Sequence, residues 1–408
     1  MKKLNSLFLV IALLCSCKEN RFTYSDPMAN MPIIAQQVIS PQGDTIVVCN
    51  TSLIKDTVDF PISNLLSEFE LVKLEDTDEA LIDGVYRFAV TPMHLCLFSY
   101  NDGLKLFDKE GHFITNISNR GQGPFEYFNA VDDLFIDEDE RVIYFSGSFQ
   151  RNLLVFDLKG NALKQIPFAQ NKPVNPIRFK IDKENDKVYI YQETFKDKEA
   201  LCFWTQDYMG NMKQQVKAGH LAPNSTHYNL GDLMNTNNLD FSAGYWWDDD
   251  RVDSLYHYDE GANRMKPVFT ANLTSIPTFH LYVELPNHYL IKMGDYGGVL
   301  TNYKYILIDK QTLKGSYVHF KLDMLGNIDL QEWIYFVHGN YFKEIHPYEL
   351  LEKWQGSNDF SELPANMAKF MKYLQTHDIE DMNNVVLIGK LKQNKDEEFV
   401  LHDMNFND

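Results

Sequence analysis

Short runs of alternating apolar and polar residues cover most of the chain and predict β-strands. Four such runs follow one another at residues 86–90, 94–100, 103–107 and 113–117. β-Branched and aromatic residues dominate each run, and turn-forming residues separate the runs. The same layout returns at 130–136, 142–145, 152–156 and 163–167. Each unit therefore predicts one small antiparallel sheet of four strands.

A repeated turn sequence follows the third run of each unit. Phe107-Asp108-Lys-Glu-Gly111 recurs as Phe156-Asp157-Leu-Lys-Gly160, and weaker copies follow at Asp207, Asp259 and Asp309. The aspartates are 49, 50, 52 and 50 residues apart. Aspartate suits a turn because its carboxylate accepts backbone N–H groups, and glycine takes the positive φ that follows. A strand-rich period near fifty residues indicates the blades of a β-propeller. A turn explains the aspartates better than calcium binding does, since no DxDxDG pattern occurs.

The later units are less regular. Strand-like runs lie at 177–181, 188–191, 201–204, 241–247, 254–258, 290–293, 303–308, 333–337 and 341–345. Helical patterns then begin at Pro347 and Pro364, and strand character returns at 385–391. We predict an all-β fold over residues 61–408, a six-bladed β-propeller with an α-helical insertion at about 346–380 in the last blade. Phe69–Leu74 is positioned to close the ring against that blade.

The first residues predict export and a lipid anchor. Lys2 and Lys3 precede an apolar run at 7–14 that is too short to span a bilayer. Leu14-Cys15-Ser16-Cys17 then resembles the bacterial lipobox, with Cys17 as the lipidated residue, the alternative being a plain signal peptide with incidental cysteines. We therefore expect a lipoprotein signal peptide at 1–16 and a tether at 17–60, with one hairpin near 45–48.

The expected partner of this anchor is the lipid bilayer, reached through acylated Cys17, and the expected place is the outer membrane. Lys18-Glu19 resembles a signal that sends lipoproteins to the outer face of the outer membrane. The two residues fit an ordinary polar tether equally well, so the periplasmic face is the alternative location. Asp44, Asp56 and Asp253 each begin an Asp-Ser/Thr-apolar triplet that resembles an O-glycosylation motif.

Net charge and cysteine content argue against several kinds of partner and site. The 408 residues carry a formal net charge of −19, which argues against a nucleic-acid partner because phosphate binding needs a basic face. Cys49, Cys96 and Cys202 are odd in number and widely spaced, so they predict neither a disulfide framework nor a metal site. We expect no metal and no cofactor.

One segment carries a family resemblance. Gly121-Gln-Gly123-Pro-Phe-Glu126-Tyr127 resembles the Gly-x-Gly-Pro-x-Glu-Tyr stretch of the six-bladed β-propeller lipoproteins of Bacteroidota, which are NHL/TolB-like. Residues 252–256 and 384–392 agree with that family, and the similarity covers roughly 60–392. Ser254, Phe269 and Phe125 depart from its pattern. The resemblance implies fold and location more than activity.

The loops between blades hold the candidate ligand-binding residues. Crossovers between blades share one face of a propeller with the loops between second and third strands, and ligands commonly bind there. The candidates on this face are Arg120, Glu126, Tyr127, Trp246, Trp247, Asp248 and Tyr296. An arginine suits an anionic ligand, and exposed tryptophans beside carboxylates suit a sugar or a peptide. In the alternative interpretation, Glu126 holds its own loop in place by accepting backbone N–H groups, and the tryptophans pack between blades.

Enzyme signatures are missing from the sequence. No HExxH, GxSxG, P-loop or sialidase Asp-box occurs, and the 12 histidines lack zinc spacing. Two acids brought together by folding would leave no local trace, so a polysaccharide hydrolase or lyase with carboxylates in the central funnel stays the alternative. We favour a non-enzymatic binding or scaffolding protein of the cell envelope, with a glycan, peptide or envelope-protein ligand.

Overall fold

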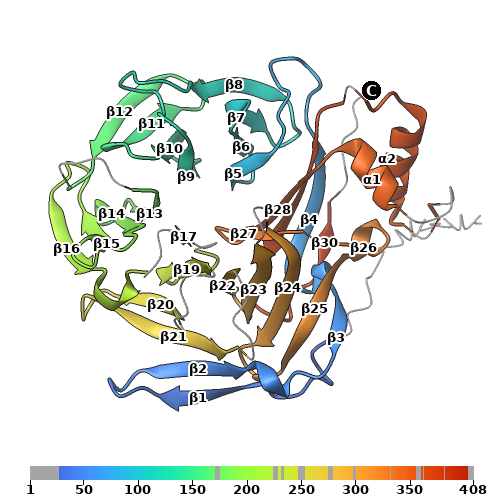
Figure 1. Cartoon of the computed structure of the whole chain (residues 1–408). Coiled ribbons are helices and arrows are strands. Elements are labelled where there is room, and N and C mark those ends of the chain that lie inside the picture. Colours follow the sequence, from blue (N-terminus) through green and yellow to red (C-terminus); the bar gives the residue numbers. More distant parts are fainter. Residues whose placement is uncertain are drawn as a thin grey trace, which may run out of the picture.

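Six β-sheets surround a common centre and form a six-bladed β-propeller (Figure 1). The computed structural model describes residues 27–170, 175–223, 228–230, 234–246, 253–273, 279–296, 300–330, 332–354, 360–361, 363–380 and 382–402. The signal peptide and Cys17 lie outside the described residues. The all-β, six-bladed prediction is confirmed.

Three consecutive blades have the four-strand layout that the alternating pattern predicts. In each of them the strands pair antiparallel in chain order, and the first strand lies nearest the centre (Figure 1). Their strands are β5 (Val85–Val90), β6 (His94–Ser99), β7 (Gly103–Asp108) and β8 (Phe113–Ser118); β9 (Val131–Asp137), β10 (Val142–Gly147), β11 (Asn152–Asp157) and β12 (Ala162–Pro167); β13 (Ile177–Asp182), β14 (Lys187–Gln192), β15 (Leu201–Gln206) and β16 (Met212–Lys217).

The repeated Asp-to-Gly sequence forms the turn between the third and fourth strands of these blades. Asp157 Oδ1 accepts the backbone N–H of Asn161 at 2.8 Å, and Gly160 has a φ of +81°. The turns at Asp108 and Asp207 are built in the same way. The aspartates therefore serve as turn acceptors, because each carboxylate satisfies N–H groups that the hairpin leaves unpaired.

The fourth blade combines strands from two distant parts of the chain. Its strands are β18 (Asp240–Phe241), β20 (Ser254–Asp259), β21 (Arg264–Asn272), β2 (Thr45–Asn50) and β1 (Ala35–Ile39). β2 runs parallel to β21, and Arg264 donates to both carboxylate oxygens of Asp44 at 2.7 and 2.6 Å. The hairpin predicted near 45–48 is confirmed. The prediction of a tether is wrong from residue 35 onward, because these strands cover sheet edges that would otherwise stay open.

The fifth blade is widened on both sides. Its strands are β17 (Tyr228–Leu230), β19 (Ala243–Trp246), β22 (Phe279–Glu284), β23 (His288–Tyr296), β24 (Leu300–Asp309), β25 (Gly315–Leu322) and β26 (Ile328–Asp329), and β3 (Thr57–Pro61) pairs parallel with β25. The prediction of one strand at 241–247 is wrong. β18 pairs with β20 of the fourth blade, whereas β19 crosses to β22 near the centre (Figure 1).

The sixth blade closes the ring. Its strands are β27 (Tyr335–Val337), β28 (Asn340–Ile345), β29 (Val385–Leu391), β4 (Leu66–Lys73) and β30 (Val400–Leu401). β4 pairs antiparallel with β29 from Lys73↔Val385 to Leu66↔Leu391, so the predicted closure by this N-terminal segment is confirmed. The helices α1 (Pro347–Lys353) and α2 (Ala365–Thr376) lie between β28 and β29 in the chain.

Hydrophobic packing joins neighbouring blades. The core between the fifth and sixth blades includes Phe60, Phe320 and Phe336. Met367, Phe370, Met371 and Leu374 of α2 are buried in the same core, which explains the apolar face of that helix. Short 3-10 helices lie at Thr51–Leu53, Ile62–Asn64, Gly219–Leu221 and Asp323–Leu325. Within the described residues no helix is long and apolar enough to cross a membrane.

Candidate functional site

One end of the propeller carries the crossovers between blades and the loops between second and third strands. We call this end the crossover face; it includes residues 100–102, 119–130, 148–151 and 193–200. Backbone and side-chain hydrogen bonds join these loops, as Ser148 N–H donates to the Ala130 carbonyl at 2.9 Å and Gln150 Nε2 donates to the Glu126 carbonyl at 2.5 Å. The crossover at 119–130 and the loop at 148–151 are therefore joined directly.

Glu126 holds the first of these crossovers in shape. Its Oε2 accepts the N–H of Gly123 at 2.8 Å, and a Cβ on Gly121 would lie only 1.9 Å from the same oxygen. Tyr127 is 4% exposed, and its ring meets Phe98 edge-on with the centroids 5.4 Å apart. The structure thus assigns Tyr127 to the core, which corrects its predicted place on the ligand surface.

Arg120 stands at the surface of the same crossover. It is exposed, and its Nη2 lies 3.4 Å from Asn129 Oδ1, a long contact that leaves most of the guanidinium in solvent. An exposed arginine in high dielectric binds anions weakly. The geometry therefore makes Arg120 an accessory contact rather than the centre of a site.

The remaining predicted residues belong to the fourth and fifth blades. Trp246 ends β19 and pairs with Phe279, and Tyr296 ends β23 and pairs with Leu300. Trp247 and Asp248 lie outside the described residues. The described strands thus bring Trp246 to the innermost part of the fifth blade.

Four aromatic side chains lie in the described loops of the crossover face. Tyr100, Phe128 and Phe149 are 48%, 53% and 49% exposed, and Phe195 is half-buried. We call these four residues the aromatic rim. Phe149 and Phe195 have φ angles of +60° and +46°. Such angles are strained for a bulky residue and cost on the order of 1–3 kcal/mol each.

Two arginines from different blades meet near the axis. Arg87 of β5 and Arg178 of β13 both donate to the backbone carbonyl of Asp132 on β9, at 2.7 and 2.5 Å. The two donating nitrogens are therefore no more than about 5 Å apart. Both side chains are half-buried. We call them the axial arginine pair.

The acidic side chains beside the pair are engaged elsewhere. Asp132 accepts a hydrogen bond from the Ser148 hydroxyl through Oδ1, and its buried Oδ2 has no partner. Burial raises the pKa of Asp132 to about 6, although Ser148 and the arginines oppose that rise. Asp133 Oδ2 accepts the N–H of Phe179 at 2.9 Å. Among the described residues, the pair's hydrogen bonds therefore end on uncharged oxygens.

Sequence reasoning missed the axial pair, although a signal was present. Arg87-Phe88 and Arg178-Phe179 occupy corresponding places in the innermost strands of two blades. A charged residue repeated within such an apolar strand is unexpected, because innermost strands are largely buried. The repeat pattern could have identified both arginines. Only the fold shows that they point to one carbonyl.

Other charged groups lie at the opposite end of the blades. Glu284 accepts hydrogen bonds from His257 Nε2 and Lys310 Nζ, both at 2.6 Å. A groove of about 620 Å³ runs along β4, with Lys73, Lys109 and His338 among its lining residues. These charges are largely matched within the protein, as in the Lys109–Glu70 ion pair.

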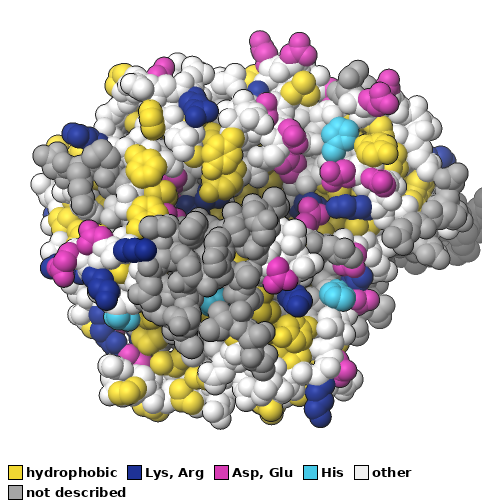
Figure 2. Space-filling model, viewed as in Figure 1, with side chains coloured by type: hydrophobic (Ala, Val, Ile, Leu, Met, Phe, Trp, Pro, Cys, Tyr) yellow, Lys and Arg dark blue, Asp and Glu magenta, His cyan; other side chains and the backbone are white. Residues whose placement is uncertain are grey.

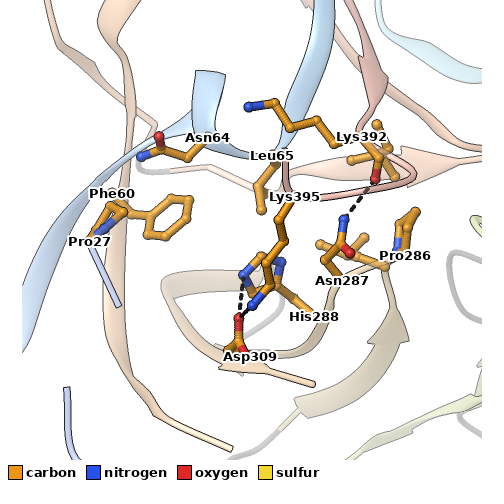
Figure 3. A pocket seen from close by; sticks show the side chains of 12 residues that line it. Pro27, Phe60, Asn64, Leu65, Pro286, Asn287, His288, Asp309, Lys392 and Lys395 are labelled. Atoms are coloured by element: carbon orange, nitrogen blue, oxygen red, sulfur yellow. Dashed lines mark hydrogen bonds and ion pairs between the residues drawn. The ribbon is translucent and has the colours of Figure 1, made fainter. Parts of the chain in front are cut away.

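A small cavity of about 20 Å³ lies between the N-terminal segment and the fifth blade. Lys395 and His288 both point toward Asp309, and Asn287 Nδ2 donates to the Lys392 carbonyl at 3.0 Å (Figure 3). Burial lowers the pKa of His288 to about 4. The volume is too small for more than a water molecule or two, so the cavity is structural. No cluster of metal-binding side chains occurs within the described ranges.

The ring of six sheets defines the chain as a six-bladed β-propeller whose crossover loops lie on one face. The chain belongs to the family described as Domain of unknown function (DUF4934), whose model matches residues 44–390. No curated protein matches it. The lipoprotein and NHL/TolB-like parts of the resemblance remain predictions.

Solved structures from Bacteroides are similar to this chain. One is a Bacteroides fragilis protein described as exported; it shares 14% identity, the alignment covers 85% of this chain and 99% of that one, and the TM-score is 0.55. Another is a duf4221 family member from Bacteroides vulgatus, with 10% identity, 80% and 97% coverage, and a TM-score of 0.47. The first similarity supports the fold.

Proposed function

We propose that this protein is a non-enzymatic binding protein of the cell envelope that holds a glycan or peptide ligand on the crossover face. The observation that carries the proposal is the pair of strained phenylalanines, Phe149 and Phe195, in corresponding loops of neighbouring blades. Bulky residues held at such φ angles are uncommon, and they cluster at functional sites. Exposed aromatic rings offer flat apolar surface at low entropic cost, which suits the faces of sugars and of peptide side chains.

Hydrophobic side chains lie among acidic and basic ones over the face that Figure 2 shows. Charges of both signs are interspersed there, which suits a ligand bound through several kinds of contact. Arg120, Trp246, Trp247, Asp248 and Tyr296 remain proposed contributors to the site. Glu126 contributes by shaping the crossover.

The experiment exchanges Phe149 for glycine. Glycine accepts a φ of +60° without strain, so Phe149→Gly should raise the free energy of unfolding by about 1 kcal/mol while it weakens ligand binding tenfold or more. Met209→Ala is the matched control, because Met209 is 77% exposed on a turn between third and fourth strands. Binding is measured by calorimetry over a panel of oligosaccharides and peptides. Unchanged affinity in Phe149→Gly would remove the rim from the site.

An envelope location supports the same function. The proposed anchor is diacylated Cys17, which would hold the propeller at the outer membrane on its periplasmic or surface face. Cys17→Ala should abolish metabolic labelling with radioactive palmitate and release the protein from the membrane fraction. Retention of the label in that variant would contradict the lipidation site. Turnover of any polysaccharide by the purified protein would instead favour the hydrolase or lyase alternative.

A further inference from the structure

We propose that the axial arginine pair binds the anionic group, a uronate carboxylate or a sulfate ester, of an acidic saccharide. The inference rests on the proposed function of the crossover face and adds the chemical class of its ligand. The argument depends on unused hydrogen-bond donors, on the absence of a direct ion pair among the described residues and on a line of aromatic rings that leads to the aromatic rim.

Arg178 keeps donors available for a ligand. A guanidinium has five N–H groups in a planar fork that matches two acceptor oxygens. In the described structure Arg178 donates only through Nη1, to the carbonyls of Asp132 and Ile177 at 2.5 and 3.1 Å. Its Nε and Nη2 groups therefore donate no hydrogen bond within the described residues, and they are the donors that we assign to a carboxylate or a sulfate.

Arg87 is held rigidly beside it. Its Nε donates to the Asp132 carbonyl at 2.7 Å, its Nη1 to the Tyr86 carbonyl at 2.9 Å and its Nη2 to the Tyr86 hydroxyl at 3.0 Å. Fixed donors bind an anion with little further loss of side-chain entropy. The geometry thus provides one preorganised and one partly free guanidinium.

The pair has no direct ion-pair partner in the described part of the chain, although the Asp132 and Asp133 carboxylates lie near enough to stabilise the charge of both guanidiniums. Neither arginine forms an ion pair within the described residues, since each donates to uncharged oxygens. Burial lowers the pKa of Arg178, and the charge of Arg87 lowers it further. An anion between the two guanidiniums would relieve this repulsion, and partial burial strengthens its attraction to both.

A line of aromatic rings leads from the pair to the rim. The Arg87 guanidinium lies over the Tyr86 ring at 3.8 Å, and the Tyr86 and Tyr100 rings are 4.8 Å apart. Tyr100 belongs to the aromatic rim. A sugar ring can place its acidic group on the arginines and its apolar face on these tyrosines, which also offer hydroxyl groups. This combination favours a saccharide over an acidic peptide.

The whole-molecule charge limits how acidic the ligand can be. A formal net charge of −19 repels polyanions at long range, whereas the arginine pair attracts only at short range. The fitting ligand is therefore a saccharide with one or a few acidic units.

The test compares acidic and neutral forms of one sugar on the full chain. The probes are a disaccharide ending in glucuronic acid, its methyl ester, a 6-sulfated disaccharide, its unsulfated form and a glutamate-containing tripeptide. Calorimetry should show tenfold or greater preference for either acidic disaccharide over its neutral partner. Arg178→Gln should remove that preference, and Arg178→Lys should keep part of it. Arg141→Gln, at an exposed arginine in the turn between β9 and β10 and outside the crossover face, removes the same charge and should leave the preference unchanged.

The outcomes separate this inference from the proposed function. Equal binding of acid and ester, both weakened by Phe149→Gly, would overturn the inference and leave the proposed function standing. Failure of both acidic disaccharides to bind would overturn the inference, whereas the proposed function is overturned only if the wider panel of oligosaccharides and peptides also fails to bind. Tighter binding of the tripeptide than of the acidic disaccharides would also overturn the inference. So would an Arg178→Gln variant that prefers the acid over its ester by the same ratio as the unmutated protein. The acid-to-ester ratio in the unmutated protein decides the question even if a variant does not fold.

Discussion

Two buried carboxyl groups of the fourth and fifth blades have opposite pKa shifts. Burial, together with the charge of Glu284, raises the pKa of Asp240 to about 7. Burial also acts to raise the pKa of Glu284, but His257 and Lys310 outweigh it and bring that pKa to about 2. Asp240 Oδ1 accepts the N–H of Met234 at 2.8 Å, and its Oδ2 has no partner. At neutral pH Asp240 is therefore a source of instability.

Asp240→Asn tests this pKa shift. The folded-state pKa of about 7 lies above the ordinary aspartate pKa of 3.8, so the stabilising contribution of the protonated group is present below pH 4 and is lost as pH rises through 7. Asparagine resembles the protonated form. Relative to the unmutated protein, the variant's free energy of unfolding should rise by about 2–4 kcal/mol between pH 4 and pH 8. Urea denaturation at both pH values measures this change in the free energy of unfolding. Asp139→Asn is the control, because the Asp139 side chain is 93% exposed. A constant difference would show that Asp240 titrates normally.

Residue patterns predicted turns well and ligand contacts poorly. The aspartate turns depend on neighbouring backbone atoms, so local sequence was sufficient for them. Tyr127 was misplaced because its burial depends on Phe98 from another strand. The axial pair depends on three strands that are far apart in the sequence. A functional group built from such strands leaves only a weak local trace.

At the scale of elements, β4 has the largest consequence for the fold. It joins residues near the N-terminus to β29 near the C-terminus, and Phe69 at its centre is fully buried. This pairing covers the open edge of the sixth blade. The closing strand was predictable because it directly precedes the first regular unit. The strands β1, β2 and β3 were missed as blade components because they pair with the outer strands of other blades and add no repeat of their own.

Phe69→Ala should weaken the closure. Deleting a fully buried phenyl ring costs roughly 3–5 kcal/mol through lost burial and the cavity left behind. Ser67→Ala on the same strand removes only a 3.3 Å contact with the Lys390 carbonyl and should cost less than about 1 kcal/mol. Denaturant titrations followed by fluorescence give both values. A cost of less than about 1 kcal/mol for Phe69→Ala would mean that ring closure contributes little to global stability.

The division of the predicted strand at 241–247 into β18 and β19 shows what alternation cannot predict at this scale. Alternation correctly identifies strand character near 241–247, but it does not say which sheet edge the strand joins. β18 and β19 are separated by Ser242, whose hydroxyl accepts the N–H of Tyr282 from β22 at 3.3 Å. The choice of partner depends on the packing of two blades, which is a long-range property.

At the scale of the whole molecule, the axial arginine pair and the net charge act on a ligand over different distances. The axial arginines act within a few ångströms, whereas the net charge of −19 acts over a Debye length. That length falls from about 30 Å at 0.01 M salt to about 10 Å at 0.1 M. Salt should therefore screen the long-range repulsion more than the short-range attraction.

The association rate of an acidic disaccharide provides the test. Raising the salt concentration from 0.01 to 0.1 M should increase this rate roughly twofold, while the rate for the neutral methyl ester should not change. Stopped-flow measurement of ligand-induced fluorescence gives both rates. A decrease with salt would mean that a local basic field, and not the net charge, governs the approach of the ligand.

The sequence by itself determined the number of blades, the strand order of the regular ones, the aspartate turns and the closing strand. All of these depend on alternation, on turn chemistry and on a fifty-residue period, which are local or periodic properties of a chain. Tertiary structure alone decided the N-terminal edge strands, the crossing of β19 into the fifth blade and the meeting of Arg87 with Arg178. Each of these brings together residues that are far apart in the chain, so packing between blades determines them.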